Sequence, residues 1–299
     1  MNVSALIQCA GDLSCLIGQL VTALMIATVL FLVASGLSLI FGVMGVVNFA
    51  HGSLYMLGAY LCYAAMQAVG VFGVAAVLAG LGVGILGVVL EHFLLNRLYG
   101  GPVLYQLLFT YALILIFDDL VKAVWGYQFH SMGVPDFFIR PPLEIMGTVI
   151  PFYNVFLIFA GVSIGIGMWL FLGYSSIGRL IRAAADDSEM LGALGVNVRL
   201  LYTIVFGVGS VLAALGGVLS GPLRSIYPGM GTSVIIDSFI VLVIGGLGSV
   251  GGAVAGSLIL GVVKALALLG FPDLEESLPF MVMALLLVVR PHGLFGKPG

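Results

Sequence analysis

The sequence predicts an all-α, polytopic integral membrane protein with about eight to ten transmembrane or half-spanning helices, some of them broken by glycine. Hydrophobic residues make up 62% of the 299-residue chain and charged residues only 8%, whereas a soluble domain has roughly 25% charged residues. The mean hydropathy is +1.25. Because one helical span needs about 20 apolar residues, we expect a single transmembrane domain over 1–299 with no room for a second large one.

Few hydrophilic stretches separate the apolar segments. The segments cover residues 16–41, 49–69, 71–90, 106–126, 149–173, 200–222, 237–249, 252–269 and 278–290. The first 15 residues contain no Lys or Arg, so the chain lacks the positive start of a cleavable signal, and we expect the first segment to stay as a span. The segment 237–249 is short and is either a crossing helix or a re-entrant half-helix.

Basic residues gather in the hydrophilic stretch 174–199, which contains Arg179, Arg182 and Arg199. The positive-inside rule places this stretch in the cytoplasm. Counting spans from it places the remaining stretches as follows: 91–104 and Arg290 inside, and the N-terminus, 127–148 and the acidic 270–277 outside.

The chain has three cysteines. Cys9 and Cys15 can pair if the N-terminus faces an oxidising compartment, although free thiols are the default expectation. Cys62 falls inside a predicted span and has no obvious partner.

A polar interruption lies in the run GVMGVVNFAHGSLYMLGAY, residues 42–60, where Asn48 and His51 are flanked by glycines within an apolar stretch. Polar side chains at membrane depth usually mark a transport pathway. We therefore predict that Asn48, His51 and Tyr55 lie near such a pathway. A histidine in this position serves equally well to cap or brace helices.

A glycine cluster follows the strand-like run 239–244. Its residues, Gly246-Leu247-Gly248-Ser249-Val250-Gly251, match the G-x-G-x-x-G fingerprint of dinucleotide sites. Both flanks are apolar membrane segments rather than a soluble βαβ unit, and the chain contains no phosphate-binding loop for ATP. The better interpretation is a break between half-helices, where Gly245, Gly246 and Gly248 expose backbone groups to a cavity.

The segment GSLYMLG at 52–58 is echoed by GSLILG at 256–261. Interrupted helices in two corresponding halves are typical of inverted repeats around a midplane site. The echo is short, so a two-fold internal repeat and chance explain it equally well.

Several ionisable residues besides His51 fall within predicted spans: Asp118, Asp119, Lys122 and Lys264. Asp118 and Lys122 have the i, i+4 spacing of a helical ion pair. They lie near Trp125 at the end of the span, which favours a structural role at the external interface.

The largest polar feature, GRLIRAAADDSEMLGALGVNV at 178–198, is amphipathic. Ser188 is predicted to cap a short helix with Glu189 in its first turn and Gly195 at its end. The apolar residues within this feature favour docking to a cytosolic partner over a solvated connector.

Four stretches together resemble the permease subunits of branched-chain amino acid ABC importers. They are SLIFGVMGVVNFAHGSLYMLGAY at 38–60, the stretch at 178–198, VLVIGGLGSVGGAVAGSLILG at 241–261 and LLLVVRPHGLFG at 285–296. The resemblance covers nearly the whole chain in the family's motif order. It implies a single permease domain in the bacterial inner (plasma) membrane that pairs with a second, related permease as a heterodimer, together with two cytosolic ATPases and a periplasmic substrate-binding protein. It also implies a non-enzymatic chain that binds no cofactor, because the partner subunits use the ATP.

Residue by residue, the resemblance carries the pathway motif onto 48–52 and a cytoplasmic coupling loop onto 174–199. The predicted coupling residues are Gly178, Arg179, Arg182, Asp186, Asp187, Glu189, Leu191 and Gly195. This loop has Ala183-Ala184-Ala185 and then Glu189 where other ABC importers have Glu-Ala-Ala and a spaced glycine, so the individual contacts stay open. The choice among leucine-type amino acids, other amino acids, amides and urea also stays open.

Other function classes fit the sequence less well. The main alternative is a secondary carrier or channel in which His51 and Asp118 relay protons without an ATPase. A membrane enzyme is weaker, because the chain shows no metal-ligand spacing and no nucleophile motif joined to a base. The absence of a basic cluster argues against nucleic acid as a partner.

Overall fold

The protein is described by a computed structural model over residues 3–296 and is all-α apart from one small hairpin. Each predicted apolar segment is a helix: α2 (Leu13–Met44), α3 (His51–Val69), α4 (Phe72–Phe93), α5 (Val103–Trp125), α6 (Phe152–Tyr174), α9 (Val198–Ser220), α10 (Met230–Gly245), α11 (Val250–Gly270) and α12 (Leu278–Val289). The shorter elements are α1 (Val3–Gly11), η1 (Leu95–Leu98), η2 (Asp136–Phe138), β1 (Leu143–Ile145), β2 (Thr148–Ile150), α7 (Ser176–Asp186), α8 (Ser188–Ala193) and η3 (Pro272–Leu274). The all-α prediction is confirmed.

Five helical stretches within residues 3–296 are long and apolar enough to cross a membrane. They are Leu13–Met44, Phe72–Leu98, Phe152–Tyr174, Val198–Ser220 and Val250–Gly270. The apolar helices α10 and α12 are shorter, with 16 and 12 residues. At 1.5 Å per residue α10 is about 24 Å long, less than the roughly 30 Å hydrocarbon core.

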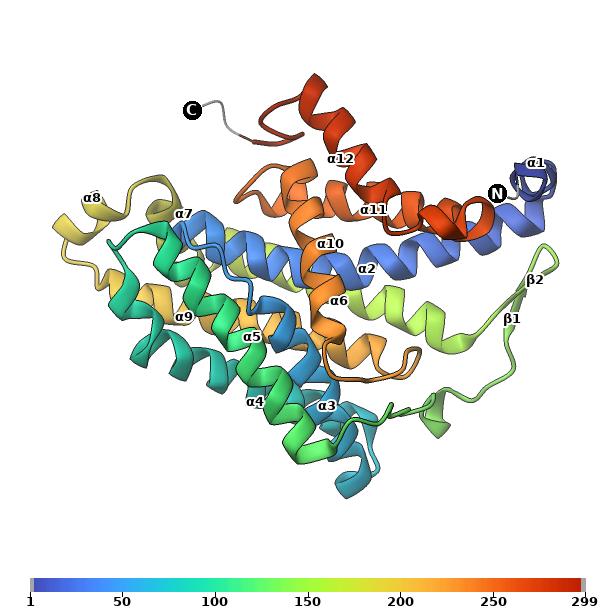
Figure 1. Cartoon of the computed structure of the whole chain (residues 1–299), viewed down its shortest axis with the longest axis horizontal. Helices are drawn as coiled ribbons and strands as arrows, with labels where there is room; N and C mark the ends of the chain where they lie inside the picture. The colour runs from blue at the N-terminus through green and yellow to red at the C-terminus, as the bar shows by residue number, and fades with distance from the viewer. Residues whose placement is uncertain (1–2, 297–299) are drawn as a thin grey trace.

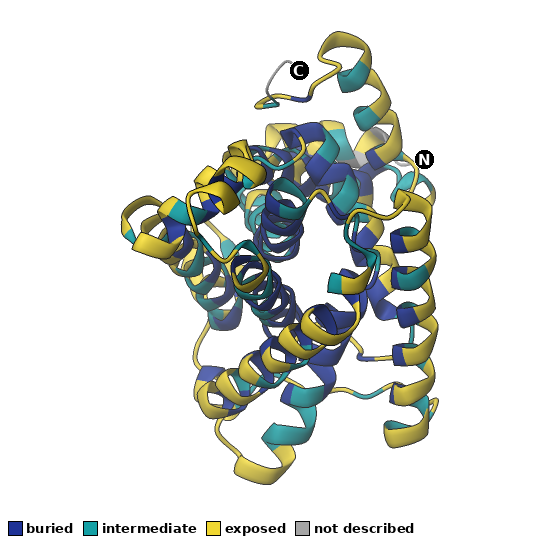
Figure 2. Cartoon of the chain, turned by 90° about the vertical axis from the view of Figure 1, so that its left-hand side faces the viewer, coloured by how far each residue is buried: buried dark blue, intermediate teal, exposed yellow. Residues whose placement is uncertain are grey.

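Helix α2 lies at the centre of the molecule and packs against α9, α10, α11 and α6 (Figure 1). Glycines set the closest of these contacts, because a Cβ added at Gly36 would lie 2.6 Å from the backbone oxygen of Gly209 in α9. Small residues let helix backbones approach closely in lipid, where helix association depends on packing and hydrogen bonds rather than on the hydrophobic effect. Figure 2 shows the outcome, with buried residues on the inner faces and exposed residues on the outer faces.

Two groups of short elements lie at opposite ends of α2. At one end, called here the hairpin end, α1 and the antiparallel β1–β2 hairpin meet, and the Thr148 hydroxyl donates to the backbone oxygen of Ser14 at 2.6 Å. The other end, called the α7–α8 end, carries α7, α8 and η1. The sequence-based topology places the hairpin end outside and the α7–α8 end in the cytoplasm.

Helix α10 begins at Met230, seven residues before the predicted start at 237. The predicted start was wrong because 223–236 was counted as a hydrophilic stretch, whereas residues 230–236 are helical and Asp237 forms an ion pair with Lys264 of α11 inside the helix. The strand-like run 239–244 is also helical. An intramembrane charge with a partner does not end a span.

Cys9 and Cys15 form a disulfide, so the default expectation of free thiols was wrong. The turn at Asp12 between α1 and α2 brings the two Cα atoms to 5.2 Å, within the range that a disulfide requires. Cys62 is free and fully buried in α3.

The disulfide tests which way the chain crosses the membrane. In intact cells, a membrane-impermeant reductant followed by an impermeant maleimide should label Cys9 and Cys15, because an oxidised pair is expected on the outer side. Cys62 should stay unlabelled until the protein is denatured, since its side chain is buried. Peptide mass spectrometry reads out the three sites. Labelling of the pair only after the membrane is opened would contradict the external placement.

Candidate functional site

The candidate site is the junction at which the first turns of α3 and α10 meet inside the helix bundle. Gly45, with φ of +66°, ends α2, and the chain returns without helical structure to start α3 at His51. Gly52 then touches Gly231 of α10 backbone to backbone, since a Cβ on Gly52 would fall on the Gly231 carbonyl. Both helices therefore begin next to each other, with the positive ends of their dipoles in the protein interior.

Asn48 and His51 are both fully buried at this junction. The His51 Nε2 atom lies 3.1 Å from the Val33 backbone oxygen of α2. Because a carbonyl only accepts, Nε2 carries the hydrogen and donates it. His51 Nδ1 and both amide atoms of Asn48 have no hydrogen-bond partner within residues 3–296. Orphaned buried polar atoms are costly and rare, so they call for a reason other than folding.

Tyr55 connects α3 to α9 one turn beyond His51. Its hydroxyl lies 2.6 Å from the Ser220 hydroxyl at the end of α9, and the ring is fully buried. Gly217 of α9 packs directly on the Tyr55 backbone. Tyr55 thus braces α3 against α9 rather than facing an open channel in this conformation.

A narrow cleft beside the junction is lined by Phe49, Gly52, Ser53, Ile114, Asp118, Gly231, Thr232 and Ile235. Asp118 reaches it from α5 and accepts a hydrogen bond from the Gly229 backbone at the start of α10. The predicted Asp118–Lys122 pair was wrong, because Lys122 pairs with Asp119 at 2.9 Å. Since the imidazole of His51 bonds to α2 and Asp118 bonds to α10, the two predicted relay residues are not hydrogen-bonded to each other.

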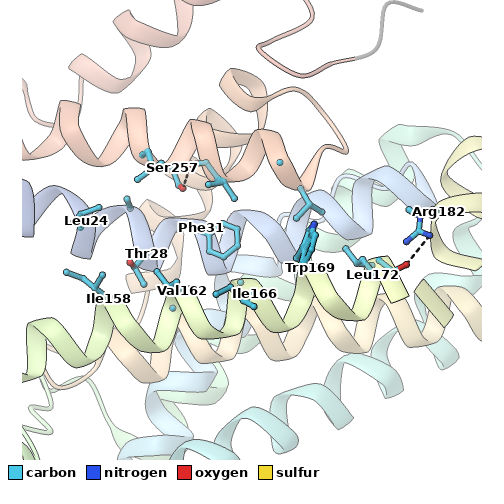
Figure 3. A pocket seen from close by; sticks show the side chains of 18 residues that line it. Leu24, Thr28, Phe31, Ile158, Val162, Ile166, Trp169, Leu172, Arg182 and Ser257 are labelled. Carbon is cyan, nitrogen blue, oxygen red and sulfur yellow. Dashed lines mark hydrogen bonds between the residues drawn. The ribbon is translucent and has the colours of Figure 1, made fainter. Parts of the chain in front are cut away.

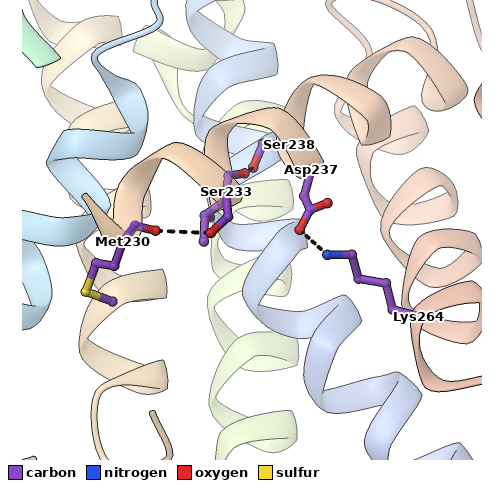
Figure 4. Close-up of polar contacts among 6 residues, drawn as sticks. Met230, Ser233, Asp237, Ser238 and Lys264 are labelled. Carbon is purple, nitrogen blue, oxygen red and sulfur yellow. Dashed lines mark hydrogen bonds and ion pairs between the residues drawn. The ribbon is translucent and has the colours of Figure 1, made fainter. Parts of the chain in front are cut away.

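An ion pair joins α10 to α11 one turn beyond the cleft (Figure 4). Lys264 donates to the Asp237 carboxylate, and both side chains are largely buried. Lys264 was noted in the sequence, but its partner was missed because α10 was predicted to start at Asp237. Extending the helix by two turns would have placed Asp237 on a buried face and revealed the pairing.

The predicted glycine break is a tight turn between α10 and α11. Gly246 and Gly248 have φ of +103° and +79°, and Gly245 packs on Gly252. The carbonyls of Ile244 and Gly245 accept backbone hydrogen bonds from the C-terminal residues Leu294 and Phe295, so the freed groups are satisfied.

This glycine turn is separate from the junction along α2. Gly248 contacts Gly42, whereas His51 contacts Val33, which lies nine residues earlier and therefore about 13 Å away along the helix. The echoed segments also differ in place, since 52–58 begins α3 and 256–261 lies inside α11. In the structure, the counterpart of the α3 start is the start of α10.

Helices α7 and α8 form the predicted amphipathic surface at the α7–α8 end, displayed toward the viewer in Figure 2. Gly178, Ile181 and Leu191 are buried and anchor it, and a Cβ on Gly178 would collide with the end of α6. The predicted coupling residues that are exposed are Arg179, Arg182, Asp186, Asp187, Glu189 and Gly195. Met190 and Leu194, which are 60% and 75% exposed, form an apolar patch. Exposed apolar patches of this kind are typical of sites that contact a partner.

The cap of α8 differs from the prediction. Asp187, not Ser188, accepts the hydrogen bond from the Met190 backbone at 2.9 Å, because Ser188 is already the first helical residue. Glu189 lies in the first turn, and Gly195, with φ of +86°, follows the helix end, as predicted. Carboxylates near a helix start are stabilised by its dipole.

Within the part of the chain that the structure describes, no group of three or more His, Cys, Asp or Glu side chains could hold a metal ion. The junction and the α7–α8 surface are the candidate functional features.

Comparison with known proteins places the whole chain among membrane transport components. The family model for the branched-chain amino acid transport system permease component matches residues 19–289. The high-affinity branched-chain amino acid transport system permease protein BraD of Pseudomonas aeruginosa is 30% identical over 94% of this chain and 95% of its own length. LivH of Escherichia coli K12, a protein with the same description, is 26% identical over 89% of this chain and 91% of its own length.

A relative that matches over a shorter region is named for a different substrate. The fructose import permease protein FrcC of Rhizobium meliloti is 32% identical, but over only 41% of this chain and 35% of its own length. No solved structure matches the chain.

Proposed function

Because this chain belongs to the family of branched-chain amino acid transport system permease components, we propose that it forms half of the translocation pathway of an ATP-driven importer for branched-chain or other small amino acids. The family match along residues 19–289 carries this proposal. The relatives BraD and LivH, which are aligned over nearly their full length, support amino acids as the substrate class. A self-sufficient carrier fits a transport-system component poorly, and the proton relay it requires is not joined in the structure.

The junction of α3 and α10 is the proposed pathway element. Two helix starts inside the bundle direct backbone N–H groups and positive dipole ends toward one region, which suits the carboxylate of an amino acid. Asn48 and His51 retain hydrogen-bonding atoms without partners there. These atoms can be satisfied when the helices move and the pathway opens, which gives a reason for their burial cost.

The α7–α8 surface is the proposed site of coupling to the ATPases. It exposes Asp187, Glu189, Met190 and Leu194 at the end assigned to the cytoplasm, while Gly178 and Leu191 attach it rigidly to the bundle. A partly apolar surface that is held rigidly can bind a partner and transmit its movement to α6 and α9, the helices that precede and follow it in the chain. Two cytosolic ATPases, a second related permease and an external substrate-binding protein complete the proposed importer, with ATP bound only by the ATPases.

Replacing Asn48 separates the pathway role from a structural role. Asn48→Leu removes two orphaned buried polar atoms, so the assembled complex should be as stable as wild type or more stable by about 1 kcal/mol. Uptake of leucine per assembled complex should nevertheless fall about tenfold or more, which corresponds to about 1.4 kcal/mol. Thermal unfolding of the purified complex and radiolabelled uptake in vesicles measure the two effects.

Gln106→Leu is the matched control, because Gln106 is a buried amide in α5, outside the junction, with its oxygen also unpartnered. Its uptake per complex should stay near wild type. Normal uptake kinetics in Asn48→Leu would remove Asn48 from the pathway.

Charging the exposed patch of α8 tests the coupling surface. Met190→Glu places a carboxylate in the proposed apolar contact, and recovery of the ATPases with the tagged chain should fall about tenfold, together with ATP-dependent uptake. Met146→Glu is the control, since Met146 is 70% exposed at the tip of the hairpin on the opposite end. Equal ATPase recovery with both variants would exclude the α8 patch as a docking site.

A further inference from the structure

A groove of about 560 Å³ runs between α6 and α11, with α2 as its floor (Figure 3). Its walls are almost entirely apolar, with side chains such as Phe31 from α2, Val162 and Trp169 from α6, and Val254 from α11. The groove belongs to neither the junction nor the glycine turn, and the proposed function does not use it.

The groove exists because α6 packs closely against α2 through two of its glycines. A Cβ on Gly161 would collide with Thr28, and a Cβ on Gly165 would lie 2.9 Å from the Phe31 ring. This contact holds α6 close to α2 but does not bring it against α11. The larger side chains of α6 are left exposed to the bilayer on the groove side, with Val162 53% and Trp169 62% exposed.

One end of the groove carries a positive charge. Arg182 of α7 alone is charged among the described lining residues, and it lies at the α7–α8 end, where its guanidinium reaches the Gly173 backbone oxygen at 3.5 Å. The side chain of Arg182 is among those that line the groove. A guanidinium with donors to spare at the membrane interface is a natural partner for a phosphate.

The length of the groove fits one lipid chain. Its α6 wall extends over 16 residues, from Ile158 to Gly173, or about 22 Å along the helix. One leaflet of the hydrocarbon core is about 15 Å thick, so the groove can hold an acyl chain over its full length with the headgroup at the charged end. Trp169 lies toward that end, and tryptophan favours the membrane interface.

We propose that this groove is a binding site for an anionic phospholipid of the cytoplasmic leaflet, with an acyl chain between α6 and α11 and the headgroup phosphate at Arg182. The single terminal charge and the otherwise apolar walls match a molecule with one charged end and a long apolar tail. A bound lipid fills the space that α6 leaves open and supports α6 at the point where it leads into α7.

Photolabelling of the complex tests the site. The chain, purified with its accompanying subunits, is placed in vesicles of phosphatidylethanolamine and phosphatidylglycerol, with a trace of phosphatidylglycerol that carries a diazirine in one acyl chain. Peptide mass spectrometry should locate the adducts mainly on 158–173 and 250–258. Val254→Phe fills the groove and should abolish this labelling, whereas Val262→Phe, on the same helix at a similarly exposed position outside the groove, should not.

The headgroup contact is tested separately. Arg182→Gln should reduce capture of the phosphatidylglycerol probe relative to a phosphatidylethanolamine probe about fivefold, the contribution of one basic residue at a membrane surface. Arg179→Gln, on the same helix but outside the groove, should leave the ratio unchanged. Arg182 is exposed, so this pair of variants keeps the test open if Val254→Phe does not fold.

Labelling spread evenly over the lipid-facing helices and insensitive to Val254→Phe would overturn the site. Adducts formed in the groove by a second permease chain, detected with a photoreactive residue at position 254, would assign it to a subunit interface instead and equally overturn the lipid proposal. An unchanged ratio in Arg182→Gln would overturn the headgroup assignment.

Discussion

The backbone contact between Gly52 and Gly231 is the constraint on which the arrangement of the bundle depends. It allows two helices to start side by side inside the molecule, which in turn requires α2 to end at Gly45 and the chain to return before α3 begins. Non-helical backbone at membrane depth is tolerated only where protein or a water-filled cavity surrounds it. Among the returning residues, Val46, Asn48 and Ala50 are accordingly buried.

The spans were predictable because lipid demands continuous apolar helices, and each predicted segment is helical. The missed ion pair, the missed helix contact and the missed disulfide share one cause, which is that pairing across the fold is invisible to a local pattern. Asp237 looked like a helix boundary because its partner Lys264 is 27 residues away in α11. The polar run around Asn48 was found from the sequence, but its counterpart at Gly231 carries no polar signal and appears only once the two helices are in contact. Cys9 and Cys15 could be paired only after the turn between α1 and α2 was known.

The junction, the α7–α8 surface and the groove between α6 and α11 are connected through α2 and α6. Helix α2 receives the His51 hydrogen bond on one side and forms the floor of the groove on another, while α6 ends where α7 begins. Helix α7 contacts α6, α2 and α9, so a movement imposed on α7 can reach the junction through all three helices. A lipid bound in the groove would support α6, one of these helices, while the unpaired polar atoms of Asn48 and His51 lie at the junction.

The proposed position of the junction on the transport pathway can be tested directly. Thr232, which faces the cleft beside it, can be replaced by cysteine, because Cys9 and Cys15 are bonded and Cys62 is buried. The most direct measurement is the rate at which a small, water-soluble thiol reagent modifies this cysteine in the assembled importer, with and without ATP trapped on the ATPases. If the junction lines the pathway, the rate changes between the two states and is slowed by transported substrate. An identical rate in every state, with no effect of substrate, would exclude the junction from the pathway.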